Sequence, residues 1–281
     1  MYKNTNLLKS IKNSLKNIGL ILFDIDGVIR SVENSYRLSL KRTVFKFSGW
    51  EPSYKDIDCA KNEGIWNNDW DLSLELIKRF IKKENLKLQI PSRDEIVKCF
   101  EEFYFGGDPN KDSKHWSGFI TNEELLVDKN FFDLLQSKGI VWGFVSGAES
   151  ASAKFVLEKR LGLKSPPLIC MGDAPDKPDP KGFIYLSKKL LGDKLGSSNI
   201  PIAYVGDTIA DINTVINARK EIPSQKFISI GIAPPHLHLK SRIKERISYE
   251  LNLKKSGADL ILNSINDLKN INLENFKILE N

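Results

Sequence analysis

The sequence predicts an α/β protein built on a doubly wound parallel sheet, with an α-helical domain inserted into it. Three observations support this fold class. Short apolar runs alternate with helix-like stretches in the second half of the chain. A long interval without any strand follows the first run. The chain of 281 residues is also long enough for a core domain and a smaller second one.

The first predicted strand is GLILFD at 19–24, an apolar run that ends in acidic residues and a glycine. Similar runs predict further strands at 140–146, 167–172, 201–207, 227–233 and 258–264. Helix-like stretches lie between them at 130–138, 151–161, 181–191, 209–219 and 239–253. Strands that alternate with helices favour a parallel sheet covered on both faces.

The inserted domain fills the interval of about a hundred residues between the first strand and the next one near Ile140. Leu72, Leu76 and Phe80 recur there at four-residue spacing, which is typical of an amphipathic helix. We therefore predict a helical cap domain. Gly27 to Asn34 and Gly106 to Ser117 are rich in turn-forming residues and are predicted to be its linkers. The predicted boundaries are 1–33 and 119–281 for the core domain and 34–118 for the cap.

The composition is that of an ordinary globular protein, with 41% hydrophobic and 28% charged residues. No run approaches the roughly 18 apolar residues of a membrane helix, and the lysine-rich start lacks the apolar block of a secretory signal. We therefore predict a cytoplasmic protein without a membrane partner. Apolar residues at helical spacing between Leu7 and Ile18 predict a short helix on the core. Cys59, Cys99 and Cys170 are predicted to be buried thiols in a reducing compartment.

The net charge of +6 raises the question of nucleic-acid binding. The lysines are scattered along the chain, and no basic stripe with interleaved aromatic residues is present. A diffuse basic surface usually aids solubility or attracts small anions. We therefore predict that the chain does not bind nucleic acid.

Polar residues stand at the ends of the predicted strands: Asp24, Asp26, Ser146 and Asp207, with Lys177 in a following loop. The carboxyl ends of parallel strands meet at one edge of the sheet, so these side chains should converge. Several acidic groups with one lysine would repel one another without a cation. Oxygen ligands without histidine or cysteine suit Mg²⁺, which we predict as the cofactor.

Each of these residues has a role that its chemistry allows. Asp24 could attack phosphorus and form an aspartyl-phosphate, while Asp26 would protonate the leaving oxygen and later deprotonate the attacking water. Ser146 and the neighbouring backbone amides, such as that of Gly147, could bind phosphate oxygens. Lys177, in a proline-rich loop, would balance negative charge during the transfer.

Asp207 and Asp211 belong to the string GDTIAD, where a strand passes into a helix. The two aspartates are four residues apart, and Asp211 falls one turn into the helix on the same face. Asp207 is predicted to bind the metal directly. Asp211 is predicted to support the site through water or through Lys177.

Four motifs occur in this order: DIDGV at 24–28, VSG at 145–147, KPDP at 177–180 and VGDTIAD at 205–211. Together they resemble the haloacid-dehalogenase-like hydrolase superfamily. The closest resemblance is to its phosphoglycolate-phosphatase-like branch, which carries a helical cap directly after the first motif. One departure is that IRSVENS places Arg30 and Asn34 where the family frequently has an acidic residue and a serine.

The resemblance implies Asp24 as the nucleophile and Asp26 as the acid and base, with the backbone carbonyl of Asp26 also on magnesium. It implies Ser146 and Lys177 as phosphate binders and Asp207 as a metal ligand. The implied activity is hydrolysis of a small phosphomonoester such as 2-phosphoglycolate or a sugar phosphate, by a monomer or homodimer. Because the cap sets specificity in this superfamily, the candidate substrate contacts there are Arg37, Asn68 and Trp70.

Three other functions remain open. A dehalogenase would also use an aspartate nucleophile, but the dehalogenases that the chain resembles lack an acid at the position of Asp26. A phosphomutase would use the same residues and differ only in whether the cap admits water or a second sugar hydroxyl. A binding or regulatory protein that has lost turnover is disfavoured, because every catalytic position is filled.

Overall fold

The computed structural model describes residues 18–61, 63, 65–66, 68–196 and 200–270. The chain divides into two compact units. We call Met1–Ser31 with Leu125–Asn281 the core unit and Val32–Glu124 the helical unit. The helix predicted between Leu7 and Ile18 lies outside the described residues, apart from the buried Ile18 itself. None of the helices described combines the length and the apolar character that a membrane crossing requires.

The core unit contains a six-stranded sheet with the strand order β3-β2-β1-β4-β5-β6. All of its strand pairs are parallel. The strands are β1 (Leu20–Phe23), β2 (Val141–Val145), β3 (Leu168–Ile169), β4 (Ile202–Gly206), β5 (Phe227–Ile232) and β6 (Leu260–Leu262). The predicted doubly wound α/β fold is thereby confirmed, and each predicted strand is present. Since the first strand lies in the middle of the sheet, its carboxyl end is flanked by β2 and β4.

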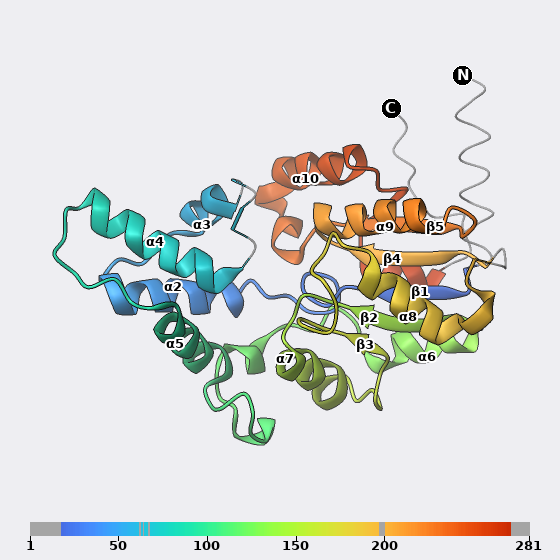
Figure 1. Cartoon of the computed structure of the whole chain (residues 1–281), viewed down its shortest axis with the longest axis horizontal. Coiled ribbons are helices and arrows are strands. Elements are labelled where there is room, and N and C mark those ends of the chain that lie inside the picture. The colour runs from blue at the N-terminus through green and yellow to red at the C-terminus, as the bar shows by residue number, and fades with distance from the viewer. Residues whose placement is uncertain (1–17, 62, 64, 67, 197–199, 271–281) are drawn as a thin grey trace. The chain divides into compact units, whose positions relative to one another are not determined.

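Helices cover both faces of this sheet (Figure 1). They are α6 (Lys129–Ser137), α7 (Ser150–Lys154) with the π-helical η3 (Phe155–Arg160), α8 (Lys181–Leu191), α9 (Ile209–Glu221) and α10 (Ile243–Lys255). Side chains of β1 alternate between the faces, as a strand requires. Ile21 and Phe23 belong to the apolar cluster with Phe131 of α6. Leu20 and Leu22 belong to the cluster with α8 and α9.

The last core helix begins later than the sequence pattern predicts. The predicted helix was 239–253, but α10 starts at Ile243. Short 3₁₀ turns, η5 (Pro235–His238) and η6 (Lys240–Arg242), precede it. The backbone of Leu239 between them is extended (φ −63°, ψ 139°), so an α-helix cannot continue through this residue.

Within its described residues, the helical unit packs four α-helices with two short 3₁₀ turns. They are α2 (Tyr36–Ser48), α3 (Tyr54–Lys61), α4 (Asp69–Lys83), α5 (Arg93–Phe105), η1 (Ser113–His115) and η2 (Phe119–Asn122). Leu72 and Leu76 of α4 are buried, as their spacing predicts. The prediction that all three cysteines are buried is wrong for Cys59, which is exposed on α3 while its neighbours Ile57 and Ala60 face the interior.

The helical unit extends beyond the predicted 34–118. It ends at Glu124 because Glu123 is buried within it, accepting hydrogen bonds from the hydroxyls of Ser35 (2.6 Å) and Tyr104 (3.2 Å). The prediction that Gly106 to Ser117 forms a linker is also wrong. Trp116 packs on Phe105 of α5, so this segment is a loop of the helical unit.

Candidate active site

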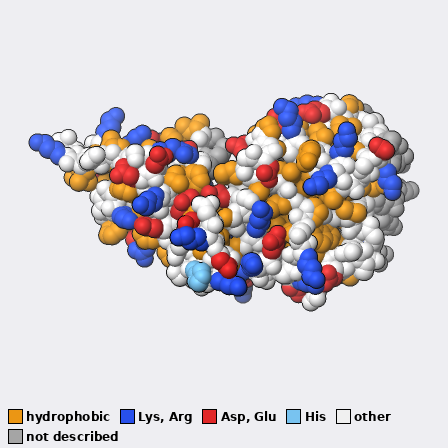
Figure 2. All heavy atoms as spheres, turned by 60° about the horizontal axis from the view of Figure 1, so that its bottom comes forward, with side chains coloured by type: hydrophobic (Ala, Val, Ile, Leu, Met, Phe, Trp, Pro, Cys, Tyr) orange, Lys and Arg blue, Asp and Glu red, His pale blue; other side chains and the backbone are white. Residues whose placement is uncertain are grey.

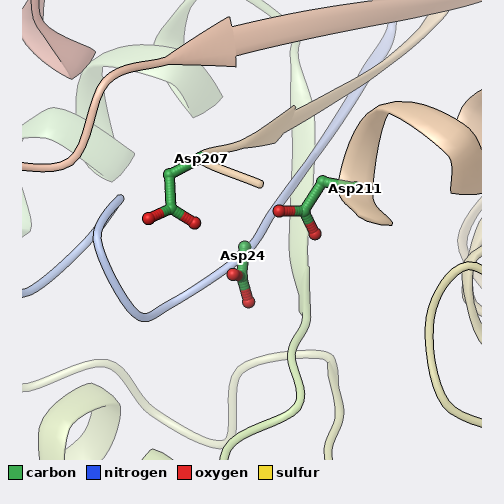
Figure 3. Close-up of side chains that lie close together, drawn as sticks. All are labelled: Asp24, Asp207 and Asp211. Atoms are coloured by element: carbon green, nitrogen blue, oxygen red, sulfur yellow. The ribbon is translucent and has the colours of Figure 1, made fainter. Parts of the chain in front are cut away.

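Three aspartates converge at the carboxyl edge of the sheet (Figure 3). Asp24 follows β1, Asp207 follows β4 and Asp211 lies in the first turn of α9. One carboxylate oxygen from each lies within 4.8 Å of the others. Because β1 and β4 are parallel neighbours, their ends deliver Asp24 and Asp207 to the same place.

Lys177 brings a positive charge to these carboxylates. Its ammonium lies 2.5 Å from Asp211 Oδ1 and 3.2 Å from Asp24 Oδ1, and it donates to the hydroxyl of Tyr204 at 3.3 Å. Burial alone would lower the pKa of Lys177, but the charges of Asp211 and Asp24 outweigh this and raise it well above its usual value. Lys177 therefore stays protonated and acts as a fixed cation.

Asp211 is committed to hydrogen bonds with the protein. Its Oδ2 accepts from the backbone N–H of Thr208 (2.9 Å) and from the Thr208 hydroxyl (2.6 Å), which completes a capping box at the start of α9. Its Oδ1 accepts from Lys177. These bonds occupy both oxygens, so Asp211 is suited to orient Lys177 rather than to bind a metal directly, as the sequence predicts.

Asp24 is buried, at 5% exposure. Its Oδ1 has the Lys177 ammonium nearby but accepts no aligned hydrogen bond among the described residues. Burial raises the pKa of Asp24 to about 6, against the lowering effect of Lys177. Loss of hydration, followed by the charges of Asp211 and Asp24, raises the pKa of Asp207 as well. The site therefore contains more carboxyl groups than its one lysine can stabilise in the ionised form.

The residues fit a hard divalent cation. The donor set consists of oxygen atoms only, and Asp24 Oδ1, which accepts no aligned hydrogen bond from the described residues, is available as a ligand. The backbone leaves space beside Asp207, since Gly27 has a φ of +77° and a Cβ there would lie 2.1 Å from Asp207 Oδ2. Asp24 and Asp207 are thus the carboxylates that can hold such a cation.

Asp26 is held apart from the other carboxylates. Its side chain is 28% exposed, and its Oδ1 accepts a hydrogen bond from Arg30 Nε at 2.6 Å. The cluster in the described part of the chain therefore contains three of the four predicted carboxylates. The motif at 24–28 does not indicate this pairing, because Arg30 lies beyond it.

Ser146 and Gly147 lie where β2 ends, next to Asp24. Ser146 is buried, at 6% exposure, and its hydroxyl contributes a hydrogen bond that lowers the pKa of Asp24. Its Oγ also accepts from the backbone N–H of Ala148 at 3.2 Å. Gly147 is exposed, with open space where a side chain would stand. Both are placed at the strand end as predicted, and their phosphate-binding role stays a prediction.

Tyr204 is a site residue that the sequence analysis missed. It is buried on β4, and its hydroxyl donates to the carbonyl of Val145 (2.6 Å) and accepts from Lys177. It thereby ties the end of β2 to the lysine. A tyrosine inside an apolar strand looks like a core residue, so only the need of its hydroxyl for a buried partner could have indicated this role.

The candidate specificity residues of the helical unit all take part in local contacts. Arg37 forms an ion pair with Asp58. The Asn68 side chain caps α4, accepting from the backbone N–H of Trp70 (2.9 Å) and of Asp71 (3.2 Å). The ring of Trp70 lies 5.6 Å from the guanidinium of Arg93. Their contact with a substrate stays a prediction.

The basic residues are dispersed on the face drawn in Figure 2, where lysines and arginines alternate with acidic and apolar side chains. This distribution agrees with the scattering of lysines along the sequence. The prediction that the chain does not bind nucleic acid stays a prediction.

The doubly wound sheet thus carries a buried aspartate, a fixed lysine and further carboxylates at its carboxyl edge. The family model for haloacid dehalogenase-like hydrolases matches residues 18–219. The chain therefore belongs to this family and is a hydrolase, and the resemblance found in its motifs is confirmed.

The chain is also similar in sequence to a longer protein and similar in fold to solved structures. A protein of Phytophthora nicotianae named imidazoleglycerol-phosphate dehydratase is 29% identical over 86% of this chain and 49% of its own length. The chain thus spans about half the length of that relative. Two solved structures share the fold. Phosphatase Tt82 of Thermococcus thioreducens is 22% identical over 75% of this chain and 92% of its own, with a TM-score of 0.58. A phosphonoacetaldehyde hydrolase-like protein of Oleispira antarctica is 16% identical over 91% and 94%, with a TM-score of 0.60.

Proposed function

We propose that this chain is a magnesium-dependent phosphatase that hydrolyses small phosphomonoesters through an aspartyl-phosphate on Asp24. The observation that carries the proposal is the state of the Asp24 carboxylate. It is buried against the Lys177 ammonium at 3.2 Å, and its Oδ1 accepts no aligned hydrogen bond from the described residues. A buried carboxylate oxygen that lies beside a fixed cation and accepts no aligned hydrogen bond is suited to attack an electrophile that carries negative charge.

In the first step, a carboxylate oxygen of Asp24 forms a bond to phosphorus. The bond from phosphorus to the ester oxygen breaks, and its electron pair stays on the leaving oxygen. Asp26 gives this oxygen a proton, so an alcohol departs. Lys177 holds the negative charge of the phosphoryl oxygens during the transfer, and the backbone amides at Ser146 and Gly147 can donate hydrogen bonds to them.

In the second step, water attacks phosphorus and gives a proton to Asp26, which the first step has left ionised. The bond between phosphorus and the Asp24 oxygen breaks, and inorganic phosphate leaves. Asp24 is again a carboxylate and Asp26 is again protonated, so the two steps return the enzyme to its starting state.

Asp24, the backbone carbonyl of Asp26 and Asp207 would hold the magnesium ion. When bound, magnesium neutralises charge on the phosphoryl oxygens and allows two anions, the nucleophile and the substrate, to approach. Asp211 remains a support for Lys177, because its oxygens already accept hydrogen bonds from Thr208 and Lys177.

The helical unit is proposed to act as the cap that selects the substrate, with Arg37, Asn68 and Trp70 as candidate contacts. 2-Phosphoglycolate and sugar phosphates are the first substrates to test. A cytoplasmic location and a monomeric or homodimeric state complete the proposal.

A narrower candidate is a phosphomonoester that carries an imidazole ring. The relative from Phytophthora nicotianae is named for an imidazoleglycerol phosphate, and this chain aligns with about half of it. Such esters therefore belong in the substrate panel. Phosphate release from imidazole esters in clear preference to sugar phosphates would select this candidate.

The test is a phosphate-release screen on a broad panel of phosphomonoesters, with magnesium or with a chelator, and with Asp24→Asn as the matched control. We expect steady phosphate release that needs magnesium and that Asp24→Asn abolishes. A phosphomutase would instead convert a hexose phosphate to an isomer without net release. Ligand binding without turnover on any ester would identify a non-catalytic protein and refute the proposal.

A further inference from the structure

Arg30 is an unusual arginine because its side chain is completely buried, at 0% exposure. A guanidinium removed from water is costly unless it is paired and hydrogen-bonded. The surrounding loop also wraps closely around this residue. Its backbone N–H donates to the carbonyl of Ile25 (3.1 Å), and its carbonyl accepts from the N–H of Gly27 (2.8 Å). These two backbone hydrogen bonds thus hold the segment that carries Asp26 around Arg30.

Two side-chain contacts fix the direction of the guanidinium. Its Nε donates to Asp26 Oδ1 at 2.6 Å, and its Nη2 donates to the hydroxyl of Ser152 on α7 at 2.7 Å. Arginine is planar and its donors point in fixed directions, so Ser152 at one end determines where the Nε–H points at the other. Asp26 is therefore oriented by a group that is itself anchored to a core helix.

A purely structural role would be to attach α7 to the loop after β1. For that role Arg30 could pair with any carboxylate, including one that takes no part in the reaction. Here the partner is the carboxylate two residues after Asp24, which keeps 28% of its side chain exposed and stays outside the cluster of Asp24, Asp207 and Asp211. Arg30 thus decides the direction of the one acidic side chain that must reach the leaving oxygen rather than the metal.

We propose that Arg30 is a positioning residue, which holds the Asp26 carboxylate in the orientation from which it exchanges protons with the leaving oxygen and with the attacking water. Ser152 fixes Arg30 in turn. This inference rests on the proposed function and deepens it.

The role has a signature that depends on the leaving group. An alkoxide needs the proton from Asp26 in order to leave, whereas p-nitrophenolate leaves without one. The hydrolysis of the aspartyl-phosphate needs Asp26 as a base for every substrate. When Asp26 is badly oriented, p-nitrophenyl phosphate should therefore phosphorylate Asp24 and then stall, while an alkyl phosphate should be slow from the start.

The experiment compares an alkyl phosphomonoester with p-nitrophenyl phosphate in rapid-mixing assays of the full chain with magnesium. The variants are Arg30→Met, Asp26→Asn as the reference for a lost acid and base, and Arg219→Met as the control. Arg219 is a matched control because it also pairs with an aspartate in the core unit, Asp259, but contacts the backbone of β5 instead of the site.

We expect Arg30→Met to lower kcat on the alkyl ester by about 100-fold, as for a misplaced catalytic group. With p-nitrophenyl phosphate it should show a burst of about one p-nitrophenol per active site followed by slow turnover, as Asp26→Asn does. The unaltered chain and Arg219→Met should show no such burst. Should Arg30→Met fail to fold, Ser152→Ala carries the test and should give the same pattern with about a threefold to tenfold loss on the alkyl ester.

Equal losses on both substrates without a burst, or no loss at all, in a folded Arg30 or Ser152 variant would overturn the role of Arg30 and leave the phosphatase proposal standing. Absence of turnover by the unaltered chain on either substrate would overturn the phosphatase proposal and the role of Arg30 with it.

Discussion

The polar residues of the core unit and those of the helical unit were selected from the same sequence, yet the structure uses them differently. In the core unit, Asp24, Asp207 and Asp211 come from separate elements and meet within 4.8 Å. In the helical unit, Asn68 caps its own helix and Arg37 pairs with a nearby aspartate. The first group joins distant parts of the chain at one place, whereas the contacts of the second stay within the helical unit.

This difference teaches that convergence, rather than polarity, identifies a site. Burial of Asp24 opposes its ionisation and raises its pKa to about 6, and its Oδ1 accepts no aligned hydrogen bond within the described residues. Asn68 stabilises α4 where it stands, by accepting two backbone hydrogen bonds. Variants at Asp24 should therefore change activity more than stability, whereas variants at Asn68 should change stability more than activity.

The largest expected effect is that of Asp24→Asn, which should lower kcat/KM by at least about 10⁴-fold, because the nucleophile is lost. The fold should persist, since an amide replaces a buried carboxyl group of almost the same shape. Asp71→Asn in the helical unit is the matched change, removing an exposed carboxylate paired with Arg93. It should change kcat/KM by less than about twofold. Phosphate-release kinetics measure kcat/KM of the two variants, and circular dichroism shows whether each is folded. Comparable losses of kcat/KM in the two variants would contradict the difference between the two units.

Gly27→Ala should have the next largest effect, because it disturbs both the backbone and Asp207. The residue has a φ of +77°, and its new Cβ would lie 2.1 Å from Asp207 Oδ2. Gly172→Ala is the control, with a φ of +86° but open space around the Cβ. Both should lose about 1 kcal/mol or more of unfolding free energy from strain.

Only Gly27→Ala should also lower the affinity for magnesium, by about tenfold or more, as measured by titration of the thermal unfolding midpoint. Equal magnesium affinity in the two alanine variants would show that Asp207 does not hold the ion.

The pH dependence of stability should reverse when magnesium is added. In the metal-free chain the pKa of Asp24 is about 6, and an unfolded aspartate has a pKa of about 4. Between these values the folded state keeps a proton that the unfolded state has released, so stability should fall as pH rises from about 4 to about 6. The expected change is on the order of 1 to 3 kcal/mol.

Magnesium binds the ionised carboxylates, so the increase in Tm that it causes should be small at pH 5 and larger at pH 7.5. The raised pKa of Asp207 acts in the same direction. Thermal unfolding with magnesium or with a chelator at the two pH values measures this. A magnesium effect that is equal at both would contradict the assignment of these carboxylates as ligands.

The smallest expected effect is that of Asn68→Ala, which should lower the unfolding free energy by about 1 kcal/mol through loss of the helix cap. Asn68→Asp keeps an oxygen that can accept the same backbone hydrogen bonds, so it should restore most of the stability. Denaturant unfolding of both variants measures this. Equal stability of Asn68→Ala and the unaltered chain would show that the cap contributes nothing.

The sheet and the position of the site could be predicted from the sequence because both depend on local patterns. Each apolar run is long enough to indicate a buried strand, and the rule that parallel strands end at one edge then brings Asp24 and Asp207 together. The position of Asp211 one turn into a helix could be predicted as well, because helix-like residues follow the strand that ends at Asp207.

The contacts that could not be predicted join residues far apart in the chain. Nothing local indicates that Tyr204 accepts from Lys177, or that Arg30 is buried against Ser152 on α7. The end of the helical unit was placed too early because Gly106 to Ser117 has the composition of a linker, while the burial of Glu123 by Ser35 and Tyr104 is a tertiary effect.

The most direct test of the central claim is to trap the phosphorylated enzyme. The full chain is mixed with magnesium and a phosphomonoester labelled with ³²P, quenched in acid within milliseconds and digested, and the labelled peptide is identified. We expect label on the peptide that contains Asp24 and none in Asp24→Asn. Label on the peptide that contains Ser146, or full turnover without any label on Asp24, would contradict it.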